Sequence, residues 1–183
     1  LLEWMRSVEF SSEVLDALRG IRGSAGTQLF DEGFLGWLGA QDGFSEIEVF
    51  GIPEGRVVHA GAPMTMIEGP LALAQILETP LLNRLNFETL IATKASRVAE
   101  AAMGGGVLEF GMRRAHGSGA NGATRAALIG GAVGSSNVGA SLDLGFSPKG
   151  THAHSMVQVF MAALGVELEA FRAYTDVYAD DCL

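Results

Sequence analysis

Two of the chain's four histidines lie in the stretch SPKGTHAHSM, residues 147–156, beside a Pro-Lys-Gly turn. In an extended strand, residues two apart share a face, so His152 and His154 could hold a metal ion together. No Asp, Glu or Cys within the stretch completes such a ligand set. The alternatives are structural histidines that hydrogen-bond to the backbone, or one chemically active histidine oriented by Thr151 and Ser155.

A second candidate is LEFGMRRAHG, residues 108–117. Gly111 allows a sharp turn or a close approach of the backbone to a ligand, and Phe110 offers a ring face. Arg113 and Arg114 carry planar guanidinium groups that match carboxylate or phosphate. An aromatic ring and an arginine near a strand end suit a flat, anionic heteroaromatic ligand. The alternative is a core phenylalanine beside surface arginines.

A third candidate is the glycine-flanked loop GAVGSSNVG, residues 131–139. Ser135, Ser136 and Asn137 can offer backbone N–H groups and hydroxyls to an anion. The loop is not a Walker A motif, because no Gly-Lys-Ser/Thr follows at the required spacing. The alternative is an ordinary polar turn.

The net charge of −9 argues against a general nucleic-acid binder. Residues 94–125 differ from the rest, because five cationic side chains stand there against two carboxylates. The five are Lys94, Arg97, Arg113, Arg114 and Arg125. This segment is either a solvated helix face or a pocket for a small anion.

Three kinds of element are expected before residue 104. Residues 1–40 predict helices, one of them with Ser11 or Ser12 as its N-cap. Residues 46–68 combine short β-branched runs with Pro and Gly turns, which predicts a small antiparallel sheet. Residues 70–103 are helical in pattern, and Pro80 predicts a break or kink that favours two helices over one.

Beyond residue 104, short apolar runs alternate with helical stretches. The expected strands are VLEF, SSNV and GTHA, and the expected helices are GATRAALIGGAV and HSMVQVFMAAL. This is the βα pattern of a parallel sheet or barrel. Ligands of such folds gather at the C-terminal ends of the strands, where all three candidate stretches would lie.

Composition sets wider bounds. The 183 residues suit one domain or slightly more, and 48% hydrophobic residues suffice for a core. The chain has no run of 18 apolar residues, so no membrane-spanning helix is expected. Its N-terminus lacks the basic flank and the cleavage site of a signal peptide. A single cysteine, Cys182, fits a reducing cytoplasm. An opening without Met, inside a helical pattern without a cap, suggests a fragment of a longer chain.

Four segments in this order resemble the nicotinate phosphoribosyltransferase family of type II phosphoribosyltransferases. They are PEGRVVHAGAPMTMIEGPLALAQILETPLLNRLNFETLIATKASR, LEFGMRRAHG, GGAVGSSNVGA and GTHAHS. The resemblance implies a fragment that lacks the family's N-terminal segment and C-terminal half. It also implies an α/β fold, with an N-terminal α+β domain and linking helices over residues 1–103 and the first βα units of an irregular α/β barrel over residues 104–183.

The activity implied is the transfer of phosphoribosyl from phosphoribosyl pyrophosphate (PRPP) to nicotinate, giving nicotinate mononucleotide and pyrophosphate. This is the first step of NAD salvage from nicotinate. ATP drives the reaction as a coupled substrate, Mg²⁺ assists, and a cytoplasmic homodimer shares its active sites. The histidine that ATP phosphorylates in the family matches His154 of GTHAHS. The resemblance gives His152 no required role.

The resemblance also implies substrate contacts. Phe110 and Arg113 match residues that stack on the pyridine ring or lie beside it, and Met112 would line the same wall. Ser136 stands where nicotinamide-using relatives carry an aspartate, which would repel a carboxylate.

Three further contacts are implied less directly. Thr151 and Ser155 would donate to phosphate or carboxylate, and Lys94 resembles a basic residue that quinolinate-using relatives lend to a neighbouring subunit. The alternatives are a quinolinate or nicotinamide phosphoribosyltransferase, or a non-catalytic truncated module. For the fragment by itself, activity is not implied.

Overall fold

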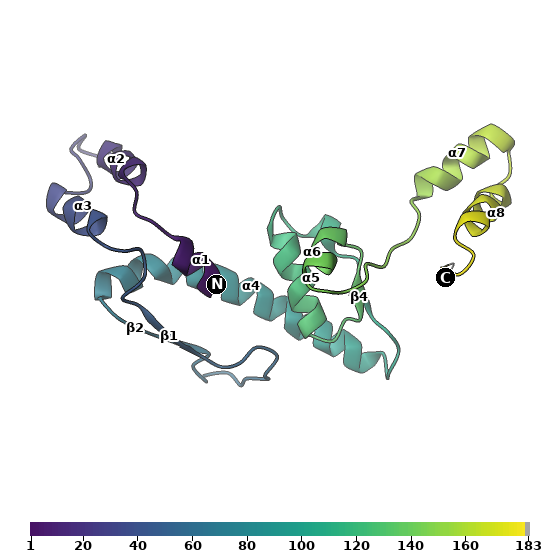
Figure 1. The fold of residues 1–183 in the computed structure, drawn as a ribbon, viewed down its shortest axis with the longest axis horizontal. Helices are drawn as coiled ribbons and strands as arrows, with labels where there is room; N and C mark the ends of the chain where they lie inside the picture. The colour runs from purple at the N-terminus through teal and green to yellow at the C-terminus, as the bar shows by residue number, and fades with distance from the viewer. Residues whose placement is uncertain (182–183) are drawn as a thin grey trace.

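The computed structural model describes residues 1–181, so the single cysteine, Cys182, lies outside the described residues. The helices are α1 (Leu2–Ser7), α2 (Ser12–Gly20), α3 (Glu32–Gly39), α4 (Leu71–Ala101), α5 (Gly119–Ile129), α6 (Val138–Asp143), α7 (His154–Leu164) and α8 (Leu168–Val177), with a 3₁₀ turn η1 (Met112–Arg114). The strands are β1 (Glu48–Gly51), β2 (Thr65–Glu68), β3 (Leu108–Glu109) and β4 (Gly134–Ser135). The molecule is elongated, with α1–α3 at one end and α7–α8 at the other (Figure 1).

The N-terminal part is held by one apolar cluster. β1 and β2 pair antiparallel, with Val49 opposite Ile67, which confirms the small sheet expected in residues 46–68, although the run RVVHA between them forms no strand. Leu73 and Leu77 of α4 lie fully buried in this cluster beside Phe44. On α2, the side chain of Ser11 accepts a hydrogen bond from the backbone N–H of Val14, so the expected N-cap is confirmed.

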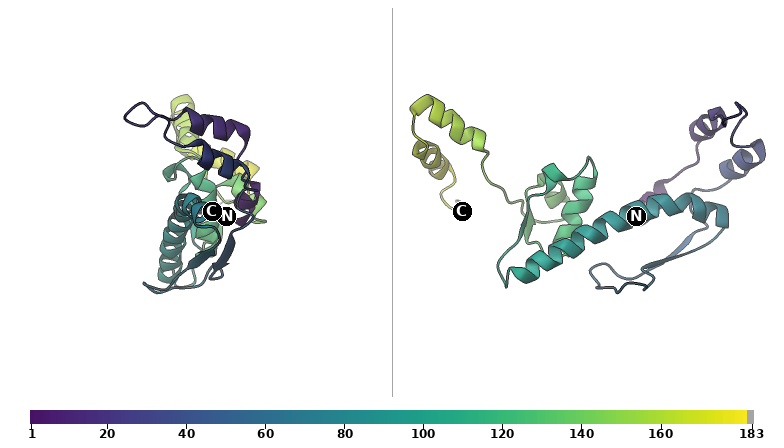
Figure 2. Two further views of the ribbon diagram at one scale, coloured as in Figure 1. Left: turned by 90° about the vertical axis from the view of Figure 1, so that its left-hand side faces the viewer. Right: turned by 180° about the vertical axis from the view of Figure 1, so that it is seen from behind.

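The expectation of two helices around Pro80 was wrong, because α4 is a single helix of 31 residues. Proline removes one backbone hydrogen bond and costs about 3 kcal/mol inside a helix. Leu77 and Leu81 flank it and are both buried in the same cluster. Since burial of a leucine side chain contributes about 1.5–3 kcal/mol, packing on both sides offsets the cost of Pro80. Figure 2 shows α4 as one unbroken helix that curves near its N-terminal end.

The chain after α4 forms a parallel βαβ unit, in which β3 pairs with β4 and α5 makes the crossover. α5 packs against the second half of α4 through small residues. A Cβ atom at Gly130 would lie 2.5 Å from the carbonyl oxygen of Ala92 and 2.7 Å from Cβ of Ala95. The mixed α/β class is thereby confirmed, and β3 lies within the expected strand VLEF. β4 overlaps the expected strand SSNV only at Ser135, because α6 already begins at Val138.

The expected third strand, GTHA, was wrong. The backbone N–H of Lys149 donates to the carbonyl oxygen of Ser135 at 2.9 Å, but residues 150–153 then run without strand pairing. Two causes are visible. The ring of His152 packs against Phe171 and Tyr174 of α8, which draws the chain away from β4. His154 is already the first residue of α7.

α7 and α8 pack on each other as a helical hairpin at the end of this extended segment (Figure 1). Gly165, in the left-handed conformation at φ 73°, ends α7 and allows the tight reversal into α8. No helix in residues 1–181 is long and apolar enough to cross a membrane.

Candidate functional site

The parallel pairing of β3 and β4 brings two of the three candidate stretches together. Glu109 lies opposite Ser135 in the register, so Phe110 and Ser136 follow the strands at the same edge. The backbone N–H of Ser136 donates to the carbonyl oxygen of Glu109 at 3.0 Å, which joins the two loops directly. We call these loops, residues 110–114 and 135–137, the strand-end loops.

The first strand-end loop presents a ring and two cations to solvent. Phe110 is 45% exposed, and Met112 is similarly exposed. The backbone N–H groups of Arg114 and Ala115 both donate to the carbonyl oxygen of Gly111, which closes the turn η1. Among the described residues, neither guanidinium of Arg113 and Arg114 has a hydrogen-bonding or ion-pair partner. This loop can therefore offer an aromatic face and unpaired positive charge to a ligand.

A polar network that the sequence did not predict lies beneath both strand-end loops. One carboxylate oxygen of Glu109 accepts a hydrogen bond from the backbone N–H of Gly111. The other accepts from the hydroxyl of Thr124 at 3.1 Å and from that of Ser135 at 2.6 Å. Thr124 and Ser135 are completely buried. A glutamate that ends an apolar strand in the sequence is the signal that could have revealed this network.

Asn137 extends the network toward α5 and α6. Its side-chain amide donates to Asn121 at 3.0 Å and to Thr124 at 3.2 Å, and its side-chain oxygen accepts from the backbone N–H of Ala140 at 3.3 Å. Asn137 thus caps α6 while it binds α5. Between Asn137 and Ser135, the half-buried Ser136 makes no side-chain hydrogen bond within the described residues, so its hydroxyl is available to a ligand.

The third candidate stretch does not join the strand-end loops. His154 and Ser155 are exposed in the first turn of α7, and the N-cap residue Ala153 offers no side-chain hydrogen bond to that turn. The first backbone N–H groups of α7 therefore lack a side-chain partner, and a helix start of this kind favours an anion. Figure 1 shows α7 at a distance from β4, at the end of the extended segment.

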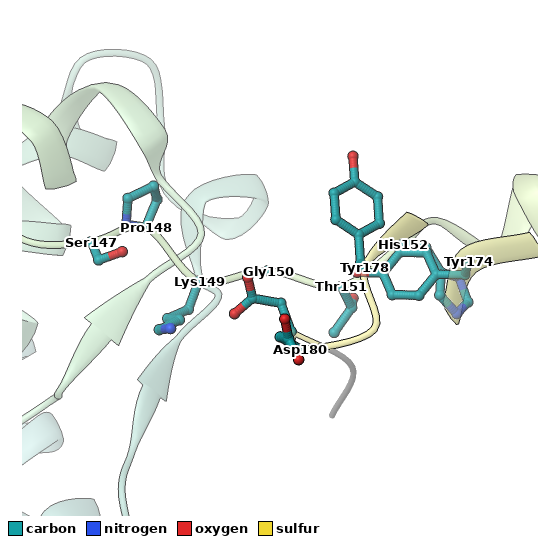
Figure 3. Close-up of a pocket in the computed structure, with 10 residues that line it drawn as sticks. Ser147, Pro148, Lys149, Gly150, Thr151, His152, Tyr174, Tyr178 and Asp180 are labelled. Atoms are coloured by element: carbon teal, nitrogen blue, oxygen red, sulfur yellow. The ribbon is translucent and has the colours of Figure 1, made fainter. Parts of the chain in front are cut away.

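A cleft lies between residues 147–152 and the end of α8 together with the residues that follow it (Figure 3). Lys149, Thr151 and His152 line one side, and Tyr174 and Asp180 are among the residues on the other. The His152 ring is held in edge contact with Tyr174, at a centroid distance of 5.4 Å, which fits a structural residue. The carboxylate of Asp180 opposes phosphate binding here, so in this arrangement the cleft does not support Thr151 as a phosphate donor.

Lys94 is also remote from the strand-end loops. α4 and α5 run side by side in the same direction: Gly119, at the start of α5, lies near Phe87, and Gly130, at its end, lies near Ala95. Lys94 therefore lies beside the end of α5, whereas the strand-end loops adjoin its start. Its side chain is exposed.

The cationic segment over residues 94–125 is not one pocket. Arg125 forms two hydrogen bonds to Glu54, at 2.8 and 2.5 Å, and lies 3.9 Å from Glu88. The hydrogen bonds from Arg125 hold the pKa of Glu54 below its ordinary value of 4.5. Arg125 is therefore a structural tie between the β1–β2 loop and α5. No group of three or more His, Cys, Asp or Glu side chains in residues 1–181 is placed to hold a metal ion.

Comparison with known proteins identifies the relatives of this chain. Nicotinate phosphoribosyltransferase pncB2 of Mycobacterium tuberculosis is 37% identical over 179 residues, which cover 97% of this chain and 36% of that protein. Nicotinate phosphoribosyltransferase 2 of Arabidopsis thaliana is 42% identical over 134 residues, covering 72% of this chain and 24% of that protein. No family model matches the chain.

A solved structure agrees with these relatives. The crystal structure of human nicotinic acid phosphoribosyltransferase superposes with a TM-score of 0.74 at 33% sequence identity, covering 86% of this chain and 31% of the human one. The chain thus spans about a third or less of the length of the proteins it matches. By sequence and by fold, it belongs to the nicotinate phosphoribosyltransferase family.

Proposed function

We propose that the complete native protein transfers the phosphoribosyl group of PRPP to nicotinate, releasing pyrophosphate and forming nicotinate mononucleotide. The observation that carries the proposal is the pairing of the two strand-end loops in a chain that is 37% identical, along nearly all its length, to a nicotinate phosphoribosyltransferase. The expected product would enter NAD salvage in the cytoplasm.

The strand-end loops supply the nicotinate site in this proposal. The exposed ring of Phe110 stacks on the pyridine ring, Met112 lines the same wall, and Arg113 pairs with the carboxylate of nicotinate. The hydroxyl of Ser136 adds a donor and no negative charge. An aspartate at this position would repel the acid substrate and favour the amide, so Ser136 supports nicotinate over nicotinamide.

His154 is the proposed phosphoryl acceptor. The exposed imidazole at the start of α7 is accessible to ATP, and one of its nitrogens attacks the γ-phosphorus while ADP leaves. Ser155 is proposed to donate to phosphate groups near it, and Thr151 to do so only once it has left the cleft that it shares with Asp180. Because α7 stands apart from the strand-end loops here, this role needs α7 to approach them when substrates bind.

Mg²⁺ and a second subunit complete the proposal. The described residues form no cluster of three metal ligands, so Mg²⁺ is assigned to the diphosphate of PRPP, where such ions usually keep several waters. Lys94, exposed and distant from the strand-end loops, is assigned to the site of the other subunit in a homodimer. The protein's part in the displacement at the ribose carbon is positioning and electrostatic support.

The test is an assay of the complete native chain for nicotinate mononucleotide, with and without ATP, beside His154→Ala. The expected result is ATP-stimulated product from nicotinate, with the stimulation lost in the variant. Nicotinamide and quinolinate serve as competing substrates. Product from either of them and none from nicotinate would refute the assignment of Ser136, and no product from any of the three would refute the enzyme proposal.

A further inference from the structure

Glu109 occupies a position that the proposed chemistry does not use. Its carboxylate is half-buried directly below both strand-end loops, and no arginine, lysine or histidine among the described residues forms an ion pair with it. Its oxygens instead accept three hydrogen bonds, from one backbone N–H and two hydroxyls. A half-buried carboxylate held only by neutral donors is costly to keep unless it has a specific task.

The two oxygens of Glu109 serve different loops. Oε1 accepts from Gly111, the residue between Phe110 and the turn that carries Arg113. Oε2 accepts from Ser135, the residue before Ser136, and from Thr124 of α5. The hydroxyl of Ser135 also accepts from the backbone N–H of Asn137 at 3.0 Å, so the second connection continues through the loop to α6.

Gly111 lies against the carboxylate of Glu109, and its lack of a side chain leaves room for that group. A Cβ atom at Gly111 would lie 2.8 Å from Oε1 of Glu109, closer than such atoms are found. The glycine therefore allows the carboxylate to reach the backbone of the first strand-end loop. The carbonyl oxygen of Gly111 accepts the two bonds that close η1, so the residue held by Glu109 is also the one on which the turn carrying Arg113 closes.

We propose that Glu109 is a positioning residue for substrate, one that locks the two strand-end loops to each other and so sets the spacing between the Phe110–Arg113 side and the Ser136 side. This inference rests on the proposed function for its kinetic consequence. Its structural part, that one side chain holds both loops, does not depend on which substrate binds.

Glu109→Gln is the matched change, since glutamine keeps the size and loses one acceptor oxygen. Either the N–H of Gly111 then faces an NH₂ group, or the hydroxyls of Thr124 and Ser135 must turn to accept from it, and in both cases the hydrogen bonds lose their charged acceptor. In the complete native chain we expect the KM for nicotinate to rise about tenfold, as expected for loss of a hydrogen bond to a charged group. The KM for PRPP should change much less.

Two variants control this experiment. Ser135→Ala removes only the connection on the β4 side and should give a smaller rise in the KM for nicotinate. Glu100→Gln removes the same charge from an exposed site on α4, where the side chain has no partner in the described residues, and should leave both KM values unchanged. A purely structural role for Glu109 would lower the folded fraction and the melting temperature without raising KM.

Amide hydrogen exchange provides a readout that needs no activity. Glu109→Ala, which removes both carboxylate oxygens, should speed exchange in both segments 107–116 and 133–142, whereas Ser135→Ala should affect mainly the second. Faster exchange in only one segment of Glu109→Ala, or an unchanged KM for nicotinate in folded Glu109→Gln, would overturn the inference. If the wild-type chain makes no product from nicotinate, the proposed function fails, and hydrogen exchange alone decides whether Glu109 joins the loops.

Discussion

The strand-end loops and the start of α7 differ in how firmly the described residues hold them. Beneath the strand-end loops, Thr124, Ser135 and Asn137 are buried and hydrogen-bonded. At the start of α7, His154 is exposed and no side chain caps the helix. Under the proposed function, the difference corresponds to a nicotinate side that is in place before substrate arrives and a phosphoryl-acceptor side that has still to approach it.

Among the variants of the strand-end loops, Arg113→Ala should produce the largest rise in the KM for nicotinate. The guanidinium is exposed and unpaired within the described residues, so its loss should not change folding, whereas a charge-assisted hydrogen bond to nicotinate contributes about 1.5–3 kcal/mol. We therefore expect the KM for nicotinate to rise roughly 10- to 100-fold in the complete chain. Steady-state kinetics measure it, with Arg114→Ala as the matched control. Equal losses in both variants would mean that the two arginines act only as general positive charge.

Ser136→Asp tests whether the second strand-end loop, residues 135–137, also contributes to nicotinate binding. A second carboxylate near that of nicotinate repels it by several kcal/mol at about 4 Å before screening, so the KM for nicotinate should rise about tenfold or more. The ratio of nicotinamide to nicotinate turnover should rise with it. Ser96→Asp adds the same charge to an exposed face of α4 and should do neither. An unchanged KM in Ser136→Asp would remove Ser136 from the nicotinate site.

Gly130→Ala should disrupt the packing of α5 on α4, the two helices that support β4. The new methyl group would collide with the backbone of Ala92 and with Ala95, so the free energy of unfolding should fall by about 1–3 kcal/mol. Gly139→Ala on α6 is the control, because nothing lies within 4 Å of its added Cβ. There the gain in helix propensity should stabilise the protein by about 0.4–1 kcal/mol. Denaturant titrations of both variants decide it, and equal stability would show that α4 and α5 separate freely.

The smallest expected effect concerns pH. The folded-state pKa of Glu54 lies below 4.5, so its pairing with Arg125 stabilises the protein above that pH. This contribution is lost as pH falls through the lower folded-state value, and for an exposed pair it is below about 1 kcal/mol. Glu54→Gln should therefore be slightly less stable than wild type at pH 7 and equal to it at strongly acidic pH. A difference that persists in acid would assign the effect to packing.

The sequence predicted the local elements better than their connections. The N-cap at Ser11 and the β3–α5–β4 unit follow from short-range patterns, and the structure contains both. Pro80 was misjudged because burial of Leu77 and Leu81, which sequence spacing does not reveal, outweighs a missing hydrogen bond. GTHA was misjudged because the aromatic contacts of His152 on α8 are long-range.

In the candidate site, too, part of the arrangement was predictable from the sequence and part was not. Phe110, Arg113 and Ser136 were placed at strand ends from the βα pattern, and the register brings their loops together. The network around Glu109 was missed because it depends on which face of a two-residue strand is covered by α5, and a strand that short carries no periodicity to show it. The catalytic and binding roles of the predicted residues stay predictions.

The unbroken helix α4 has a mechanical consequence. From Pro80 to its end at Ala101 it extends about 30 Å, so a change of roughly 5° in its curvature at Pro80 would shift the far end by about 3 Å. That shift is as large as a hydrogen bond is long. The hydrogen bonds of Arg125 to Glu54 connect the β1–β2 loop to α5, and Gly55 of that loop lies near Ile129, so the loop, α5 and α4 form a triangle with α4 as its long side. Bending of α4 at Pro80 therefore also displaces the β1–β2 loop relative to α5, which couples the orientation of the strand-end loops to the N-terminal core.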